Sequence, residues 1–179
     1  MNTRALKILA VSLGLCAAAG NLVAQVTLTN LYSFNNVDSI SNGISPVAGL
    51  VQGRDGNFYG TTSSGGGIQN GGTVFRISPS GSLKTLWTFD LILIPANLDY
   101  DGSHPNAGLV QDGDGYLYGT TYTGGTNSGV GTVFQISAGG SLTLLHTFHE
   151  AGNSGDGLHS PPSFLSCASR GNILTFRPK

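Results

Sequence analysis

The sequence predicts an all-β fold built from repeated four-stranded sheets, of the kind that form the blades of a β-propeller. Three observations carry this prediction. Residues 46–89 align without a gap on residues 105–148, with 26 identities in 44 positions. Each copy contains four short runs rich in β-branched and aromatic residues, separated by turn-forming Gly, Asp, Ser and Pro. Beyond residue 24, no segment has the 3.6-residue apolar periodicity of a capped helix.

The first 24 residues have the layout of a secretory signal peptide. Arg4 and Lys7 form a basic start, residues 8–19 are almost entirely apolar, and Ala24 is a small residue suited to cleavage. The apolar run is too short to span a bilayer. We therefore expect cleavage after residue 24 and an exported protein that is secreted or located at the cell surface, with the periplasm as the alternative.

The remaining residues, 25–179, are expected to form a single β-repeat domain. Whole units span about 42–89 and 101–148, and partial units span 27–34 and 156–179. Residues 27–34 match the end of a whole unit, whereas 156–179 match the beginning of one. In a propeller, an N-terminal strand commonly completes the last blade, so residues 27–34 are a candidate last strand for the sheet that begins after residue 156.

Two whole units are too few for a closed ring, since propellers typically have four to eight blades. The fold predicted is therefore an incomplete propeller. Three interpretations remain open: a fragment of a longer array, an assembly of several copies that completes the ring, or an open stack of sheets.

Within the first whole unit, the expected strands are residues 49–52, 57–62, 73–78 and 82–89. Asp55-Gly56 predicts a tight turn between the first two strands, because glycine readily adopts a positive φ. A single four-stranded sheet cannot bury both of its faces, so each unit is expected to stack on a copy of itself. The second unit repeats the pattern, with Asp114-Gly115 at the same turn.

The motifs LVQ-x-x-DG-x-x-YGTT and GTVF occur in both units. They resemble the GloVer-type tandem repeat family of exported bacterial proteins, and the resemblance covers nearly all of residues 27–160. It implies a propeller-like repeat fold and an extracellular or surface location. It implies no defined biochemical activity.

Charge and hydropathy narrow the range of partners. Beyond residue 24 the chain has six Lys and Arg against nine Asp and Glu, a net charge of −3, with no basic cluster. A nucleic-acid partner is therefore not expected, nor is membrane insertion once the signal peptide has been removed. The expected partners are a protein or a glycan at the cell surface, or further copies of the chain that complete the propeller. Cys167 is alone in the processed chain and excludes an internal disulfide.

Two groups of side chains suggest metal ions. Asp112 and Asp114 are spaced like calcium ligands, but the first unit has Arg54 beside its aspartate, which favours a simple hairpin turn. His146 and His149, next to a glutamate, suggest zinc, yet side chains three residues apart on a strand point to opposite faces. No metal site and no cofactor are therefore predicted.

No catalytic residue is predicted either. His104, near Asp99 and Asp101, is a candidate for acid–base chemistry, although an ordinary solvated loop is favoured there. Neither the G-x-S-x-G elbow nor the phosphate-binding G-x-x-x-x-G-K-[ST] loop occurs. Five of the nine acidic residues fall in Asp-Gly turns that already explain them, namely Asp55, Asp101, Asp112, Asp114 and Asp156.

The aromatic residues Tyr32, Trp87 and Tyr122 are candidates for stacking on sugars, although Tyr32 and Trp87 are favoured as packing residues between sheets. Residues 91–95 form an apolar connection that needs cover from a neighbouring unit or a partner. The leading hypothesis is an exported non-enzymatic scaffold or interaction module with no defined activity. The alternatives are a carbohydrate-binding propeller module and, less favoured, a propeller-type polysaccharide hydrolase or lyase.

Overall fold

The computed structural model describes residues 28–35, 41–89, 101–125 and 131–148, together with the backbone of residues 39–40, Leu165–Cys167 and Leu174–Phe176. The strands form two four-stranded sheets and one two-stranded hairpin. The first sheet contains β1 (Val51–Gln52), β2 (Phe58–Thr62), β3 (Thr73–Ile77) and β4 (Leu83–Thr88). The second contains β5 (Val110–Gln111), β6 (Leu117–Thr121), β7 (Thr132–Ile136) and β8 (Leu142–Thr147). The predicted all-β class and its four-stranded units are confirmed.

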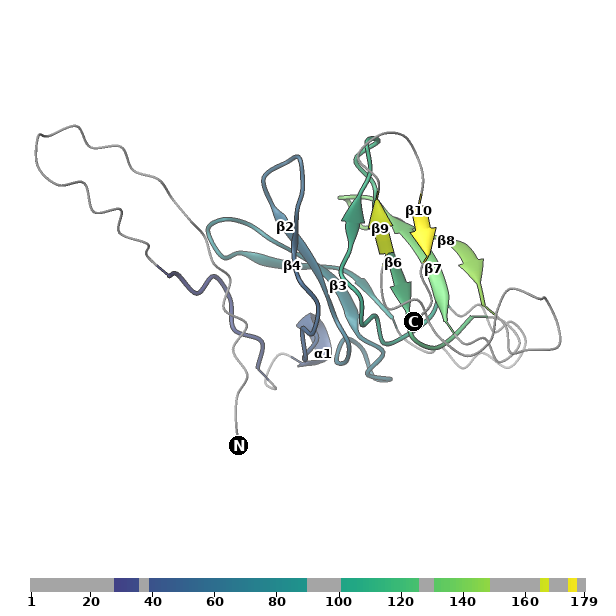
Figure 1. Cartoon of the computed structure of the whole chain (residues 1–179). Coiled ribbons are helices and arrows are strands. Elements are labelled where there is room, and N and C mark those ends of the chain that lie inside the picture. The colour runs from purple at the N-terminus through teal and green to yellow at the C-terminus, as the bar shows by residue number, and fades with distance from the viewer. Residues whose placement is uncertain are drawn as a thin grey trace, which may run out of the picture.

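Both sheets are antiparallel meanders in which consecutive strands are neighbours. Figure 1 shows the first sheet in blue and teal beside the second in green. The two sheets have the same strand register, with each pair of the second sheet 59 residues after its equivalent in the first. Thr62 faces Thr73 in the first sheet, and Thr121 faces Thr132 in the second. The third and fourth strands of both sheets share a register shift, after Val74 and after Val133. The sequence repeat is therefore a repeat of one backbone structure.

The turn between the first two strands of each sheet forms as predicted. Gly56 has a φ of +80° and Gly115 a φ of +88°, in the region that side chains disfavour. The amide of Gly56 donates to the carbonyl of Gly53 over 2.9 Å, and that of Gly115 donates to Asp112 over 3.1 Å. These Asp-Gly turns set the register of the strands that follow.

The inter-sheet core is the apolar cluster that lies between the two sheets. Tyr59, Val74 and Phe89 contribute from the first unit, and they meet a set from the second unit consisting of Leu109, Leu117, Phe134 and Ile136. The rings of Phe89 and Phe134 lie 5.3 Å apart at 58°. Burying a large apolar side chain contributes roughly 1.5–3 kcal/mol, so stacking of one sheet on its copy supplies the main stabilising contact expected from the sequence.

Residues 28–35 do not lie where the sequence predicted them, beside the C-terminal sheet. Within the described residues they form no strand with the C-terminal hairpin, in which β9 (Leu165–Cys167) pairs with β10 (Leu174–Phe176). Phe34 instead packs against Phe75 and Ile77 of β3 on the far side of the first sheet, where Figure 1 shows the segment in purple. The prediction that this segment closes the last sheet is wrong, because the adjacent apolar face of the first sheet takes it up.

In the C-terminal hairpin, β9 lies against β5 and β6, where the first two strands of a third unit are expected. Alignment on the prolines at 105 and 161 matches Cys167 to Gln111 and Leu174 to Tyr118. Leu174 faces Cys167, whereas Tyr118 faces Val110, so the hairpin is displaced by one residue from the whole units. The sequence at this turn has Arg170 in place of the aspartate.

One element has no counterpart in the predictions. The helix α1 (Ser39–Asn42) is a single turn, too short to leave a periodic pattern in the sequence. The carbonyl of Ser41 accepts a hydrogen bond of 2.8 Å from the Thr85 hydroxyl on β4, which fixes the turn to the first sheet. Among the described residues, no helix has the length and apolar character needed to cross a membrane.

Candidate functional site

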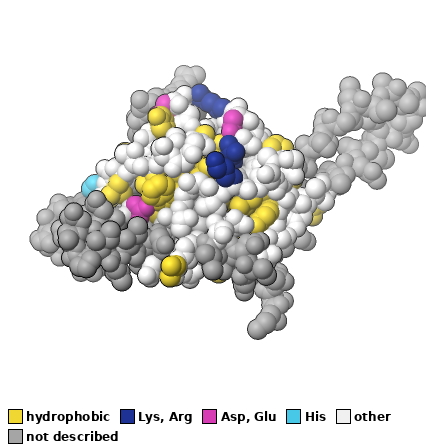
Figure 2. Space-filling view, turned by 180° about the vertical axis from the view of Figure 1, so that it is seen from behind, with side chains coloured by type: hydrophobic (Ala, Val, Ile, Leu, Met, Phe, Trp, Pro, Cys, Tyr) yellow, Lys and Arg dark blue, Asp and Glu magenta, His cyan; other side chains and the backbone are white. Residues whose placement is uncertain are grey.

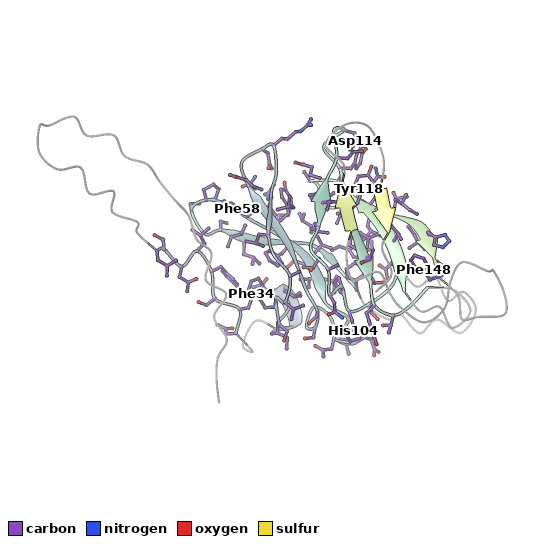
Figure 3. The ribbon with its side chains drawn as sticks, viewed as in Figure 1. Phe34, Phe58, His104, Asp114, Tyr118 and Phe148 are labelled. Atoms are coloured by element: carbon purple, nitrogen blue, oxygen red, sulfur yellow. The ribbon has the colours of Figure 1, made fainter. Side chains whose placement is uncertain are left out.

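The polar side chains that attract a functional interpretation gather at the two ends of the sheets. Figure 3 shows Asp114 and Tyr118 close together at one end of the second sheet and His104 at the opposite end. The first end holds the two Asp-Gly turns. The other holds the loops that enter each unit and the loops between its second and third strands.

At the Asp-Gly turns, each aspartate binds the strand that follows it. The Asp55 carboxylate accepts hydrogen bonds from the Asn57 amide (3.1 Å), the Asn57 side chain (2.7 Å) and the Tyr59 hydroxyl (2.7 Å). Asp114 accepts from the Tyr116 amide (2.9 Å) and the Tyr118 hydroxyl (3.1 Å). Both oxygens of each carboxylate therefore serve the turn, as the hairpin interpretation predicts.

These contacts change the acidities of the paired groups. Burial raises the pKa of Tyr59 to about 12, with a further contribution from its hydrogen bond to Asp55. Burial and the hydrogen bond to Asp114 likewise raise the pKa of Tyr118. Burial opposes ionisation of Asp55, but the hydrogen bonds from Asn57 and Tyr59 outweigh it and lower the pKa of that carboxyl. The Tyr59–Asp55 pair is thus held as tyrosine hydroxyl and aspartate anion.

The turn residue Arg54 joins the two sheets. Its backbone amide donates to Oε1 of Gln111 over 3.0 Å, and its guanidinium Nη1 donates to the carbonyl of Gly113 over 2.7 Å. Arg54, which is the equivalent of Gly113 in the first unit, therefore has a structural role: it connects the two sheets by hydrogen bonds. Asp112, the other calcium candidate, accepts from the amide of Gly113. In the described part of the chain, no three His, Cys, Asp or Glu side chains converge to hold a metal ion.

At the opposite end, three polar side chains form a cluster. The hydroxyls of Ser103 and Thr123 lie 2.7 Å apart, and Nδ1 of His104 lies 3.1 Å from the first and 3.3 Å from the second. His104 has a φ of +56°, matched by +57° at Ser45 in the first unit. Its amide donates to the carbonyl of Gly71 over 2.7 Å. The strained backbone therefore belongs to the entry turn of a unit and joins the two units.

The proposed partners of His104 in acid–base chemistry do not form a catalytic set with it. Asp101 accepts a hydrogen bond of 2.6 Å from the indole Nε1 of Trp87, and Asp99 lies outside the described residues. The Ser103 hydroxyl is buried and shared with Thr123, so a substrate has no direct access to it. This cluster positions the entry loop of the second unit.

The three aromatic candidates separate into packing and exposed residues. Trp87 packs on the inter-sheet core. Tyr32 packs on the first sheet and makes an edge-on contact of 5.0 Å with Phe34. Tyr122 is 53% exposed, and its amide donates to the carbonyls of Ser103 and His104. Of the three, Tyr122 alone has a largely exposed side chain.

The structure says less about the candidate zinc ligands, the apolar connection and the lone cysteine. His146 makes an edge-on contact of 4.7 Å with Phe148, whereas His149 and Glu150 lie outside the described residues. The same is true of the apolar connection 91–95 and of the side chain of Cys167. The hydrogen bonds of Arg54 to the second sheet and the Ser103–Thr123 cluster were not predicted from the sequence. One feature of the sequence indicates a special role for Arg54: it is a charged residue at a position where the other copy has glycine.

Figure 2 shows a face on which uncharged polar surface predominates, with small separate groups of apolar and charged side chains. The sequence profile of the family described as Gloeobacter/Verrucomicrobia repeat matches residues 20–174. No curated protein matches the chain.

Proposed function

The chain belongs to the Gloeobacter/Verrucomicrobia repeat family, and from this premise we propose that it is an exported, non-enzymatic scaffold or interaction module. In this proposal the stacked sheets are blades of a propeller-like array. The role of the array is to present surfaces and edges to other proteins outside the cytoplasm, after a signal peptide of residues 1–24 has been removed.

One observation supports the proposal most strongly. Three of the described carboxylates hold the sheets together: Asp55 and Asp114 bind the turns, and Asp101 binds the indole of Trp87. Enzymes that use two carboxylates need them facing a shared cleft, whereas these acids are spread over both ends of the sheets. What the repeats offer instead are apolar faces that join one sheet to the next.

A second candidate function is carbohydrate binding, and a specific observation favours it. Tyr122 has an exposed side chain, and its backbone amide bonds to the carbonyls of Ser103 and His104, whose side chains form the polar cluster with Thr123. Sugar sites combine aromatic rings with hydrogen-bonding groups. The hydroxyls of Ser103 and Thr123 already bond to each other, so the scaffold is the better supported of the two.

A glycan array and a panel of polysaccharides separate these functions. A scaffold binds no glycan reproducibly and releases no sugar from any polysaccharide. Binding that is lost in Tyr122→Ala but kept in the matched variant Tyr116→Ala would replace the scaffold with a carbohydrate-binding module. N-terminal sequencing of the protein recovered outside the cytoplasm tests export, with Gln25 expected as the first residue.

A further inference from the structure

Residues 28–34 hold the same position on the first sheet that β4 and the residue after it hold on the second. Leu31, Tyr32 and Phe34 precede Leu86, Trp87 and Phe89 by 55 residues. Phe34 stacks on Phe75 at 4.9 Å and 57°, and Phe89 stacks on Phe134 at 5.3 Å and 58°. The two aromatic contacts are therefore equivalent.

The hydrogen bonds of the two segments are equivalent as well. The Tyr32 hydroxyl accepts a hydrogen bond of 3.0 Å from Asn42, and the indole of Trp87 donates one of 2.6 Å to Asp101, the residue equivalent to Asn42. A Cβ placed on Gly81 would lie 2.5 Å from the carbonyl oxygen of Leu31. One placed on Gly140 would lie 2.8 Å from that of Leu86. Residues 28–34 thus have the location of the fourth strand of a sheet that precedes the first.

Among the residues that the structure describes, this fourth strand has no paired neighbour. β4 pairs with β3 along its whole length, whereas no backbone hydrogen bond joins residues 28–34 to another strand within the described part of the chain. The 55-residue spacing puts residues 18–22 (AAGNL) at the place of a third strand. This segment has one large apolar side chain, compared with three in the TVFRI of β3. Within the described ranges the edge is therefore unpaired, and the sequence of residues 18–22 is less suited to a third strand than that of β3.

An unpaired edge that packs on a neighbouring sheet is a template for a further strand. The aromatic side chains of residues 28–34 already rest on the first sheet, so little additional order is needed for binding. Resting on the scaffold function proposed above, we propose that this edge binds an antiparallel strand with the pattern Thr-Val-Phe-x-Ile. The donor of the strand is another polypeptide built from the same repeat.

The pairing of β3 with β4 fixes the expected register. Ile77 faces Leu83, and Val74 faces Trp87, so the incoming isoleucine faces Leu28 and the incoming valine faces Tyr32. Leu28 is 52% exposed, which leaves an apolar side chain available for this contact. Leu31, the equivalent of Leu86, falls at the register shift and has no residue directly opposite.

The test uses the purified protein and a fluorescent peptide of residues 72–81, GTVFRISPSG. We expect saturable binding with one peptide per chain in fluorescence anisotropy, and no binding by a peptide with proline at the position of Phe75, because proline breaks a strand. Leu28→Lys should weaken binding about tenfold, as expected for loss of one buried leucine contact. The control Ile68→Lys, at a loop position 91% exposed, should bind like the unmodified protein.

Hydrogen exchange then locates the peptide. Bound peptide should protect the amides of residues 28–33 and leave those of Thr73–Ile77 unchanged. Exchange of the peptide into the place of β3, equal binding by the proline peptide, or an unaltered affinity of Leu28→Lys would each overturn the proposal. These outcomes leave the glycan and turnover results untouched, so a failure here is distinct from a failure of the scaffold function.

Discussion

The Tyr59 hydroxyl donates a hydrogen bond of 2.7 Å to the Asp55 carboxylate, and the same pair recurs as Tyr118 and Asp114 at 3.1 Å. In each sheet, this bond joins the second strand to the turn that begins it. The ring of Tyr59 is fully buried in the inter-sheet core. One residue therefore links the register of a sheet to its stacking on the next.

Replacing Tyr59 with Phe removes the hydroxyl and keeps the apolar ring. A hydrogen bond to a charged group contributes about 1.5–3 kcal/mol. Because Asn57 continues to bind Asp55, we expect a loss near the lower limit in the free energy of unfolding, measured with urea. Tyr116→Phe is the control, since Tyr116 is exposed. An equal loss in both variants would show that the hydroxyl of Tyr59 does not stabilise the fold.

Stability should also fall in strongly alkaline solution. The pKa of Tyr59 is about 12 in the folded protein, above the ordinary value of 10.0, so the unfolded chain loses this proton first. The stabilisation from the raised pKa is fully present below pH 10 and is lost as the pH rises to 12. Unfolding by urea at a series of pH values should show this decline. Tyr59→Phe should show a shallower decline, and identical slopes would contradict the assignment.

The bond between Trp87 and Asp101 joins the end of the first unit to the start of the second. Trp87→Phe keeps most of the packing but removes the indole donor of the 2.6 Å bond. We expect a loss of about 1.5–3 kcal/mol in the free energy of unfolding. The far-ultraviolet circular dichroism should keep its β shape. Trp87→Ala should lose more, because it also removes the contact with the inter-sheet core.

Calcium should have no effect on the melting temperature. The oxygens of Asp114 bind the Tyr116 amide and the Tyr118 hydroxyl, and a ligand that binds only the folded state would raise the midpoint. Equal melting curves with calcium and with a chelator are expected. A calcium-dependent rise that Asp114→Asn abolishes would restore the calcium hypothesis.

The repeat explains why the fold was predictable from the sequence. Turn residues such as Asp55-Gly56 act locally, and alternation within a strand needs no knowledge of distant contacts. Because two copies carry the same pattern, each one checks the interpretation of the other. The one-turn helix Ser39–Asn42 escaped prediction because four residues are too few to show a period.

Placement of the terminal strand required spatial information. The sequence shows that residues 27–34 resemble a fourth strand, but both the preceding face and the final hairpin are compatible with that likeness. The fit of Phe34 on Phe75 decides between them. The Ser103–Thr123 hydroxyl pair also could not be predicted from the sequence, because the two residues are 20 positions apart and both types are common in turns.

Gly140 offers the most direct test of sheet stacking. Its φ is +103°, and a Cβ there would lie 2.8 Å from the carbonyl oxygen of Leu86 in the neighbouring sheet. Gly140→Ala therefore adds backbone strain, which costs about 1–3 kcal/mol, and pushes the sheets apart. Gly113→Ala is the matched control, because a Cβ at that glycine meets no atom within 4 Å. In urea, Gly140→Ala should unfold at lower concentration and Gly113→Ala should not.

The emission of Trp87, the single tryptophan of the chain, should shift to longer wavelength in Gly140→Ala before denaturant is added, because this indole packs where the sheets meet. Unchanged emission together with full stability would show that the sheets do not depend on this close approach.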